Sequence, residues 1–345
     1  MTESHHELAD LLWPQERPSK VLRCRHCGKK NRVDVPRALF EPETCRCGAC
    51  HGALFLERDE PLTDIASTAY EHSLDRASLQ ALKAVPGFPA AVRWLIAQLP
   101  ERLQHLQALA ATIRCDEQQF PALSGLLDQA RRRLDIPYRP ALYLDESPYM
   151  NAMTIGVEHP LITVNSALLD QFDDEEVIAV LAHELGHLHA DHVLYMTMAR
   201  ILVTLGRMTS NVISLLSFPI QLALLKWQRC AELTADRAGL LGCRDLRVAL
   251  SVQLKMAGGA RPGTLRRGEL KLGPFITQAR ELEQKEMASW LDNSLLLLLT
   301  VGRTHPYSAW RLMHLLQWVE NGNYLDIMAG EYARVKREAP EPEPA

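Results

Sequence analysis

Residues Asp173–His187 read Asp-Asp-Glu-Glu-Val-Ile-Ala-Val-Leu-Ala-His-Glu-Leu-Gly-His. An acidic start before an apolar run is typical of a helix, because an acidic side chain caps the free N–H groups and suits the helix dipole. The pattern predicts a helix that continues to about Ala190. On such a helix His183 and His187 lie one turn apart on the same face, so both imidazoles can reach one metal ion.

Glu184 lies on the adjoining flank of this helix, where its carboxylate can face a fourth, water-filled position of the metal. The pattern H-E-x-x-H is typical of zinc metallopeptidases in which the glutamate is the general base. Zinc lowers the pKa of water from about 15.7 to roughly 7, which gives Glu184 a proton to take. The alternative is a buried helix with incidental polar residues. If the helix continues to residue 192, His189 and His192 lie roughly on the side opposite to His183 and His187. We therefore interpret them as surface histidines or as a layer behind the ligands.

A second segment offers a third ligand. Catalytic zinc usually has three protein ligands, and two histidines with one glutamate are a known set. Glu232 lies in a predicted helix that reaches about Leu241, and Asp236 shares its face at i+4. We expect Glu232 to bind the metal and Asp236 to accept the outer N–H of a metal-bound histidine. The alternative is a solvated or salt-bridged helix carboxylate.

A further motif near the C-terminus reads Thr304-His305-Pro306-Tyr307. A histidine beside the metal can stabilise the oxyanion that forms during peptide hydrolysis. His305 is therefore a candidate catalytic residue. The alternative is a histidine that caps the start of the helix in which Arg311 lies.

Together these motifs resemble the HtpX and CaaX-prenyl-protease type of zinc metallopeptidases. The matching pieces occur in the family's order over roughly residues 65–320; they are Asn151-Ala152 with Gly156, His183–His187, Glu232–Asp236, and Thr304-His305-Pro306 with Arg311. The resemblance implies an α+β, mostly helical, gluzincin-like fold with a small sheet. It implies that His183, His187 and Glu232 are ligands, that Glu184 is the base, and that Asp236 and Arg311 lie behind the ligands.

The resemblance also places a strand beside the cleft. Two extended runs, Ala141–Leu144 and Leu161–Val164, are predicted strands on either side of the segment in question. The family pattern implies that this segment is an edge strand along which a peptide substrate pairs its backbone, with little side-chain selectivity. Its candidate substrate-binding residues are Asn151, Ala152, Met153 and Thr154.

One departure from the family concerns membrane helices, which HtpX-like members carry. The apolar stretch 208–225 is interrupted by polar residues and Pro219, and the stretch 193–205 is short and contains Arg200. A spanning helix needs about 20 predominantly apolar residues. We expect residues 193–225 to form a helical hairpin that packs on the peptidase or gates its cleft. Membrane insertion, and so association with the inner face of a membrane, is the alternative.

Residues 21–60 hold five of the eight cysteines and predict a small metal-organised module. Cys24 and Cys27 form one C-x-x-C pair and Cys47 and Cys50 form another, and the 19 residues between the pairs fit a zinc ribbon. Four thiolates close a tetrahedron and make a structural zinc site. Cys45 could replace Cys47, but only Cys47 has the C-x-x-C spacing to Cys50. The segment also resembles the zinc-binding N-terminal part of some bacterial thioredoxins, which implies a mobile accessory domain.

The remaining composition is that of an ordinary globular protein. The 345 residues are 47% hydrophobic and carry a formal net charge of −4, which argues against a dedicated nucleic-acid binder. The N-terminus has no secretory-signal pattern, so we expect a cytoplasmic protein with reduced thiols. Residues 1–20 are predicted to be a flexible tail and residues 336–345 a disordered one.

The sequence therefore predicts a zinc ribbon over residues 21–60 and a metallopeptidase domain over residues 61–335. The predicted function is zinc-dependent endoproteolysis of peptide or unfolded protein substrates, with one catalytic and one structural Zn²⁺. Two alternatives stay open: a non-catalytic zinc-binding adaptor or chaperone that keeps a protease fold, and a membrane-anchored protease. The oligomeric state is not encoded in these patterns.

Overall fold

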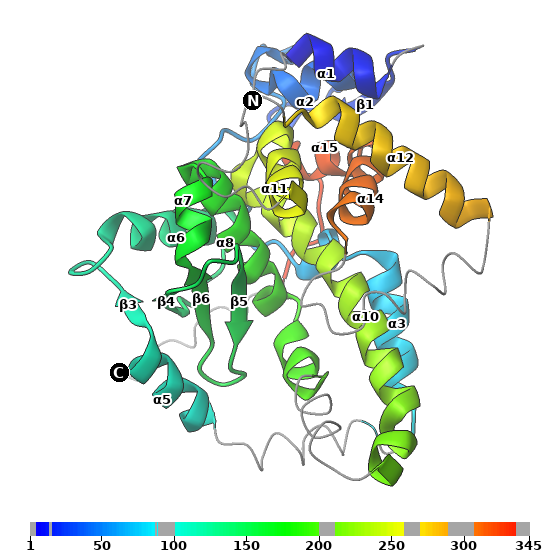
Figure 1. The fold of residues 1–345 in the computed structure, drawn as a ribbon. Coiled ribbons are helices and arrows are strands. Elements are labelled where there is room, and N and C mark those ends of the chain that lie inside the picture. Colours follow the sequence, from blue (N-terminus) through cyan, green and yellow to red (C-terminus); the bar gives the residue numbers. More distant parts are fainter. Residues whose placement is uncertain are drawn as a thin grey trace, which may run out of the picture.

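The computed structural model describes residues 5–13, 16–86, 88, 101–199, 211–258, 270–288 and 307–335. In the described part, helices surround one small four-stranded sheet, and a two-stranded hairpin belongs to the N-terminal module (Figure 1). The α+β, mostly helical class predicted from the sequence is confirmed.

The elements follow one another in a simple order. The N-terminal part contains α1 His5–Leu12, β1 Ser19–Arg23, β2 Lys30–Asp34, α2 Val35–Phe40, η1 Pro42–Thr44, η2 Ser67–Ala69 and α3 Ser73–Lys83. The middle contains α5 Glu101–Ala111, β3 Ile113–Cys115, α6 Pro121–Arg133, β4 Ala141–Asp145, β5 Ala152–Ile155, β6 Leu161–Asn165 and α7 Ser166–Gln171. The rest contains α8 Asp174–His189, α10 Asn211–Cys243, α11 Leu246–Gly258, α12 Leu272–Ala288, α14 Ser308–Glu320 and α15 Asn323–Met328.

The four-stranded sheet has the order β3-β4-β6-β5. Strands β4 and β6 are parallel, whereas β3 and β5 run antiparallel to their neighbours. Strand β5 lies at one edge, so the edge position implied for Ala152, Met153 and Thr154 is observed. Its burial alternates, with Ala152 and Thr154 buried and Met153 and Ile155 half-buried, because successive side chains of a strand point to opposite faces.

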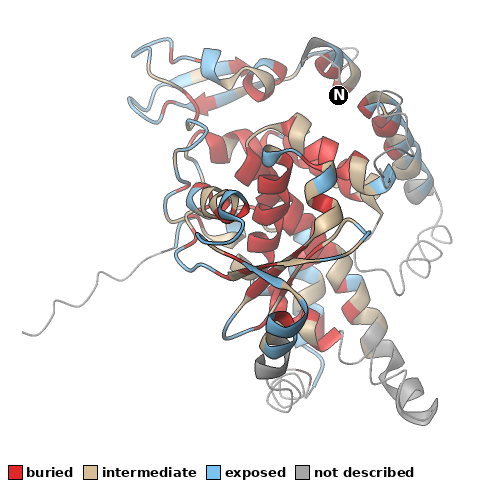
Figure 2. Cartoon of the chain, turned by 60° about the vertical axis from the view of Figure 1, so that its left-hand side comes forward, coloured by how far each residue is buried: buried red, intermediate tan, exposed pale blue. Residues whose placement is uncertain are grey.

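The centre of the molecule is the crossing of α8 and α10, which lie side by side among the most buried helices (Figure 2). Small residues line the crossing. A Cβ atom on Gly186 would lie 2.5 Å from Cβ of Ala238, and one on Gly242 would lie 2.2 Å from Cβ of Ala182. Both distances are below any real contact, so the glycines are needed for the two backbones to approach this closely.

The N-terminal segment differs from its prediction. The sequence indicates a loose tail over residues 1–20, but residues 5–12 form α1, and Leu8 and Leu12 are buried in the main core. Arg280 of α12 donates hydrogen bonds to the carbonyl oxygens of Leu11 and Leu12, at 3.3 and 3.1 Å. The tail prediction is therefore wrong for α1, because burial of its leucines on the rest of the fold stabilises a helix that is too short to be stable alone.

The cysteine module is continuous with the peptidase part. Leu22 and Val33 of its hairpin belong to the same buried cluster as α8 and α14. Lys20 Nζ lies 2.7 Å from a carboxylate oxygen of Asp326, and the backbone N–H of Leu56 donates to the carbonyl oxygen of Met328 at 2.7 Å. The module thus shares a core with the rest of the chain, whereas the resemblance to thioredoxin segments implied a mobile accessory domain.

The predicted hairpin over residues 193–225 lies partly outside the described residues, because residues 200–210 are not described. Residues 192–199 are helical, and Tyr195 and Met196 pack with Leu224 and Trp227 of α10 and with Leu82 of α3 in a second buried cluster. Within the described ranges, no helix combines the length and the apolar character that crossing a membrane requires. The predicted disordered tail, residues 336–345, also lies outside the described residues.

Candidate active site

The helix predicted around His183 is α8, and its start is capped as the acidic residues indicate. The side chain of Asp173 accepts a hydrogen bond from the Glu176 N–H, and the Glu176 side chain accepts one from the Asp173 N–H, both at 3.0 Å. This reciprocal pair is a capping box and fixes where the helix begins. The helix then runs to His189 with residues 176–187 buried, which places His183, Glu184 and His187 in the interior.

Helix α10 brings Glu232 to the two histidines. His183 Nε2 and His187 Nε2 each lie 3.4 Å from one of the two carboxylate oxygens of Glu232. All three side chains are buried, and one ligand atom from each lies within 4.8 Å of the others. In a tetrahedral zinc site with bonds of about 2.1 Å, two ligand atoms are separated by about 3.4 Å. The three side chains therefore have the spacing of ligands that share one ion.

The chemistry of the donors also fits a metal. His187 Nε2 is buried and makes no hydrogen bond within the described part of the chain, and a buried nitrogen in this position usually has a partner. Burial lowers the pKa of His187, which favours the neutral imidazole that ligation needs. Two imidazoles and one carboxylate are a donor set of catalytic zinc sites. The residues present thus fit zinc.

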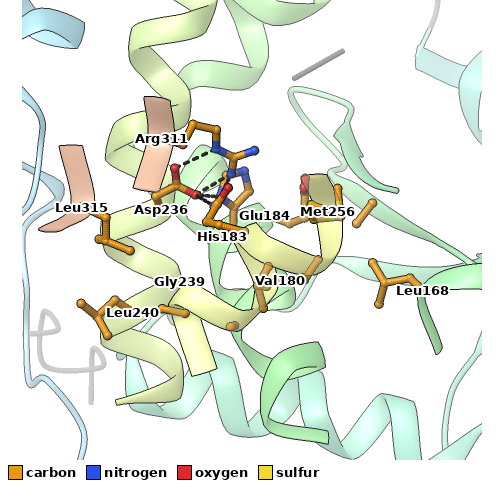
Figure 3. A pocket seen from close by; sticks show the side chains of 15 residues that line it. Leu168, Val180, His183, Glu184, Asp236, Gly239, Leu240, Met256, Arg311 and Leu315 are labelled. Atoms are coloured by element: carbon orange, nitrogen blue, oxygen red, sulfur yellow. Dashed lines mark hydrogen bonds and ion pairs between the residues drawn. The ribbon is translucent and has the colours of Figure 1, made fainter. Parts of the chain in front are cut away.

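The resemblance implies that Asp236 and Arg311 lie behind the ligands, and Figure 3 shows both beside the first histidine, His183. Arg311 Nε donates to Asp236 at 2.8 Å, Arg311 Nη1 lies 3.4 Å from Glu232, and Asp236 lies 3.2 Å from His183 Nδ1. Burial raises the pKa of Asp236, but the Arg311 guanidinium outweighs burial and holds it at about 2. Burial lowers the pKa of His183, but its carboxylate partners Asp236 and Glu232 raise it to about 9. The site therefore presents a negative field that favours a cation.

Glu184 is held by the edge strand. Thr154 Oγ1 donates to Glu184 Oε2 at 2.6 Å, and both residues are 2% exposed. The side chain of Thr154 thus points at the predicted base. The sequence did not reveal this contact, because it joins a strand to a helix 30 residues away.

A pocket adjoins the predicted base and the first histidine. His183, Glu184, Asp236 and Arg311 form its polar end (Figure 3). Apolar side chains form most of the remaining wall, and they include Leu168, Val180, Leu240, Val252, Met256 and Leu315. An apolar wall beside a carboxylate lowers the local dielectric constant and strengthens its electrostatic interactions.

His192 lies closer to the candidate metal site than its position on a continuous helix predicts. Helix α8 ends at His189, and Asp191 adopts a positive φ of 55°. The chain turns back there, so His192 Nδ1 lies 3.0 Å from His187 Nδ1. His189 instead lies 2.7 Å from the hydroxyl of Tyr70, through its Nδ1. His305, the candidate oxyanion residue, lies outside the described residues.

The four predicted cysteines converge in the N-terminal module. Sγ of Cys24 lies 3.6 Å from Sγ of Cys50, and Sγ of Cys27 lies 3.6 Å from Sγ of Cys47. One sulfur from each lies within 4.8 Å of the others, whereas Cys45 is outside the group. Tetrahedral thiolates around zinc are separated by about 3.8 Å. Backbone N–H groups, chiefly that of Cys50, lower the pKa of Cys47 to about 6, which favours the thiolate that binds metal.

Comparisons with known proteins agree with this geometry. The family model described as peptidase family M48 matches residues 117–319. Plastoglobule-localized metallopeptidase 48 of Arabidopsis thaliana is 32% identical over 268 residues, which are 77% of this chain and 76% of that protein. Protease HtpX homologs are 27% identical over 50% of this chain in Acidiphilium cryptum, covering 59% of that protein, and 36% identical over 21% in Helicobacter acinonychis, covering 24%. No solved structure is significantly similar to the chain. With its histidine pair, Glu232 and this extended similarity, the chain belongs to peptidase family M48.

Proposed function

We propose that this M48 peptidase is a zinc-dependent endopeptidase that hydrolyses internal peptide bonds of peptides or unfolded proteins. The observation that carries the proposal is the convergence of His183, His187 and Glu232 on one position, with Glu184 beside it on the same helix. A test is the cleavage of an internally quenched peptide that is blocked at both termini. An exopeptidase cannot cut such a peptide, so intact substrate after incubation would contradict the endopeptidase assignment.

The chain's own residues supply binding and proton transfer. His183, His187 and Glu232 would hold the zinc, which when bound acts as a Lewis acid for the scissile carbonyl and for water. The carboxylate of Glu184 accepts a proton from the attacking water and then donates it to the leaving amine. Asp236 accepts the Nδ1–H of His183 and so keeps its Nε2 lone pair turned to the metal. An adaptor without activity would have no use for an intact Glu184 in this position.

The position of β5 at the edge of the sheet supports a peptide substrate. An extended peptide can add to a sheet edge through main-chain hydrogen bonds, which depend little on its side chains. Ala152 lines the apolar pocket and Thr154 holds Glu184, so β5 runs along the candidate catalytic residues. We infer that the backbone of residues 151–154 orients the substrate and that the pocket accepts one apolar side chain of it.

Thr154→Val tests whether the edge strand positions the base. Valine keeps the shape of the side chain but cannot donate to Glu184, and a hydrogen bond to a charged group contributes about 1.5–3 kcal/mol. We expect kcat to fall roughly 10-fold or more, with KM little changed. Steady-state kinetics on the quenched peptide measures both. Thr154→Ser keeps the hydroxyl and should retain activity, and a Val variant as active as wild type would exclude this role.

We further propose two zinc ions per chain, one in each cluster. The cysteine cluster is structural, because four thiolates leave no open position for water. Cys47→Ser should lose about one zinc, unfold the module and expose residues 21–60 to proteolysis, because metal binding supplies much of the stability of such small modules. Cys45→Ser is the matched control, since Cys45 is buried nearby but outside the cluster. Metal analysis measures the zinc content of each variant, and limited proteolysis measures the exposure of residues 21–60. Equal zinc content in the two variants would contradict a ribbon site.

The location of the protein is a proposal of the same kind. None of the eight cysteines forms a disulfide, in keeping with a reducing compartment such as the cytoplasm. The Arabidopsis relative is described as plastoglobule-localized and chloroplastic. Detergent-free fractionation separates a cytoplasmic protein from one held at a membrane through residues 193–225.

A further inference from the structure

A buried chain of hydrogen bonds leads from His187 away from the metal position to Asp75 on α3. His187 Nδ1 lies 3.0 Å from His192 Nδ1, and His192 Nε2 lies 2.9 Å from Asp75 Oδ2. His187 and His192 are 1% exposed and Asp75 is fully buried. Asp75 precedes the residues that the M48 family model matches, and nothing in the sequence motifs points to it.

Two further donors fix the state of the Asp75 carboxyl group. The Trp227 indole Nε1–H, which can only donate, lies 2.9 Å from Asp75 Oδ1. The Thr234 hydroxyl accepts the backbone N–H of His72 at 3.0 Å and donates its own hydrogen to Asp75 Oδ2 at 2.6 Å. A carboxylate surrounded in this way acts only as an acceptor.

The state of Asp75 determines which nitrogens of His192 and His187 carry a hydrogen. Because Asp75 only accepts, His192 Nε2 must carry the hydrogen. The other nitrogen of a neutral imidazole is an acceptor, so His192 Nδ1 accepts. His187 Nδ1 must then donate, which leaves the lone pair of His187 on Nε2. Nε2 is the nitrogen that lies 3.4 Å from Glu232 and has no hydrogen bond among the described residues.

We propose that Asp75 and His192 are positioning residues that hold His187 in the tautomer that binds zinc. The inference rests on the proposed function, since it takes the ion to lie between His183, His187 and Glu232. Both histidine ligands are then supported by a carboxylate: His183 directly by Asp236 at 3.2 Å, and His187 through His192 by Asp75. Trp227 and Thr234 lie on α10, so Asp75 also ties this support to the helix that carries Glu232.

The variant Asp75→Asn is expected to reverse the direction of hydrogen-bond donation along His187, His192 and residue 75. The Trp227 N–H requires an acceptor, so the amide oxygen must face Trp227 and the amide NH₂ must face His192. His192 Nε2 then has to accept, and its Nδ1–H donates to His187 Nδ1. The hydrogen of His187 moves to Nε2 and opposes zinc binding. We expect the dissociation constant of the active-site zinc to rise about 10–100-fold, as for loss of an outer partner of a histidine ligand.

Controls separate positioning from a merely structural role. Trp227→Phe removes a hydrogen bond to the same carboxylate but leaves the tautomers of His192 and His187 unchanged. Zinc affinity should therefore stay within about threefold of wild type. In a His192→Gln background the Asp75→Asn change should no longer matter, because Asp75 acts through His192. Competition with a chromophoric chelator measures each constant, and His183→Ala, which retains only the ribbon zinc, gives the background.

The outcomes distinguish this inference from the function it rests on. If wild type binds no more zinc than His183→Ala, the proposed function fails and the inference with it. If wild type binds the second zinc and Asp75→Asn binds it equally well, the inference alone is overturned. It is also overturned if Trp227→Phe weakens zinc binding as much as Asp75→Asn.

Nitrogen NMR of zinc-loaded wild type, labelled in its histidines, needs no variant and covers the case in which Asp75→Asn does not fold. We expect His192 to be neutral with its hydrogen on Nε2. A hydrogen on His192 Nδ1 would overturn the proposal.

Discussion

Replacing Glu184 with glutamine is expected to abolish nearly all peptide hydrolysis while both zinc ions stay bound. Glutamine has almost the same shape, and its amide oxygen can still accept the hydrogen bond from Thr154. It cannot take a proton from water, and general-base catalysis contributes about 10²–10⁴-fold to a rate. We therefore expect kcat to fall by about 10³-fold. Kinetics on the quenched peptide, with metal analysis of the same sample, measures both quantities.

The control for this variant is Asp174→Asn. Asp174 lies on the same helix and the change removes the same charge, but the residue is exposed in the first turn. Its kcat should match that of wild type. Equal turnover by Glu184→Gln and wild type would remove Glu184 from the mechanism. If Glu184→Gln lost zinc, its loss of activity would reflect the missing metal and would not test the general base.

Arg311→Met is expected to cause the largest loss of stability. Arg311 is 6% exposed and is the guanidinium placed between the buried carboxylates of Asp236 and Glu232. Removing one partner of a buried ion pair costs about 3–5 kcal/mol, and without Arg311 the two buried carboxylates would have only His183 as a cationic partner. We expect a loss of that size in the zinc-free protein. Zinc partly neutralises the same carboxylates, so the loss should be smaller in the zinc-loaded protein.

Urea denaturation of both forms tests this expectation. Arg311→Lys keeps the charge but not the planar fork that reaches both oxygens of Asp236, so it should be intermediate. Arg247→Met removes a half-exposed arginine of α11 and should cost little. A free energy of unfolding for Arg311→Met within about 0.5 kcal/mol of wild type would show that the guanidinium does not neutralise this site.

The parts of the fold that the sequence predicted well are those fixed by spacing within one element. The capping box and apolar run of α8 are local, and the predicted end near Ala190 lies within one residue of the observed one. The strands that begin at Ala141 and Leu161 are predicted correctly because their pattern is also local: a short extended run bounded by prolines is typical of a strand. The tail prediction over residues 1–20 failed because α1 depends on its contacts with α12 and not on its own sequence.

Spacing along the chain is enough to show that His183 and His187 share one helix face with Glu184 on the adjoining flank, and that two C-x-x-C turns can enclose one ion. Such relations are local, because 3.6 residues per turn or a tight turn fixes them whatever else the chain does. Only tertiary packing, through the close crossing of α8 and α10 at Gly186 and Gly242, brings Glu232 to the two histidines. Tertiary packing also places the Thr154 hydroxyl against Glu184 and Asp75 against His192. These contacts join elements far apart in the chain, and they depend on how closely backbones pack, which no local pattern of residues specifies.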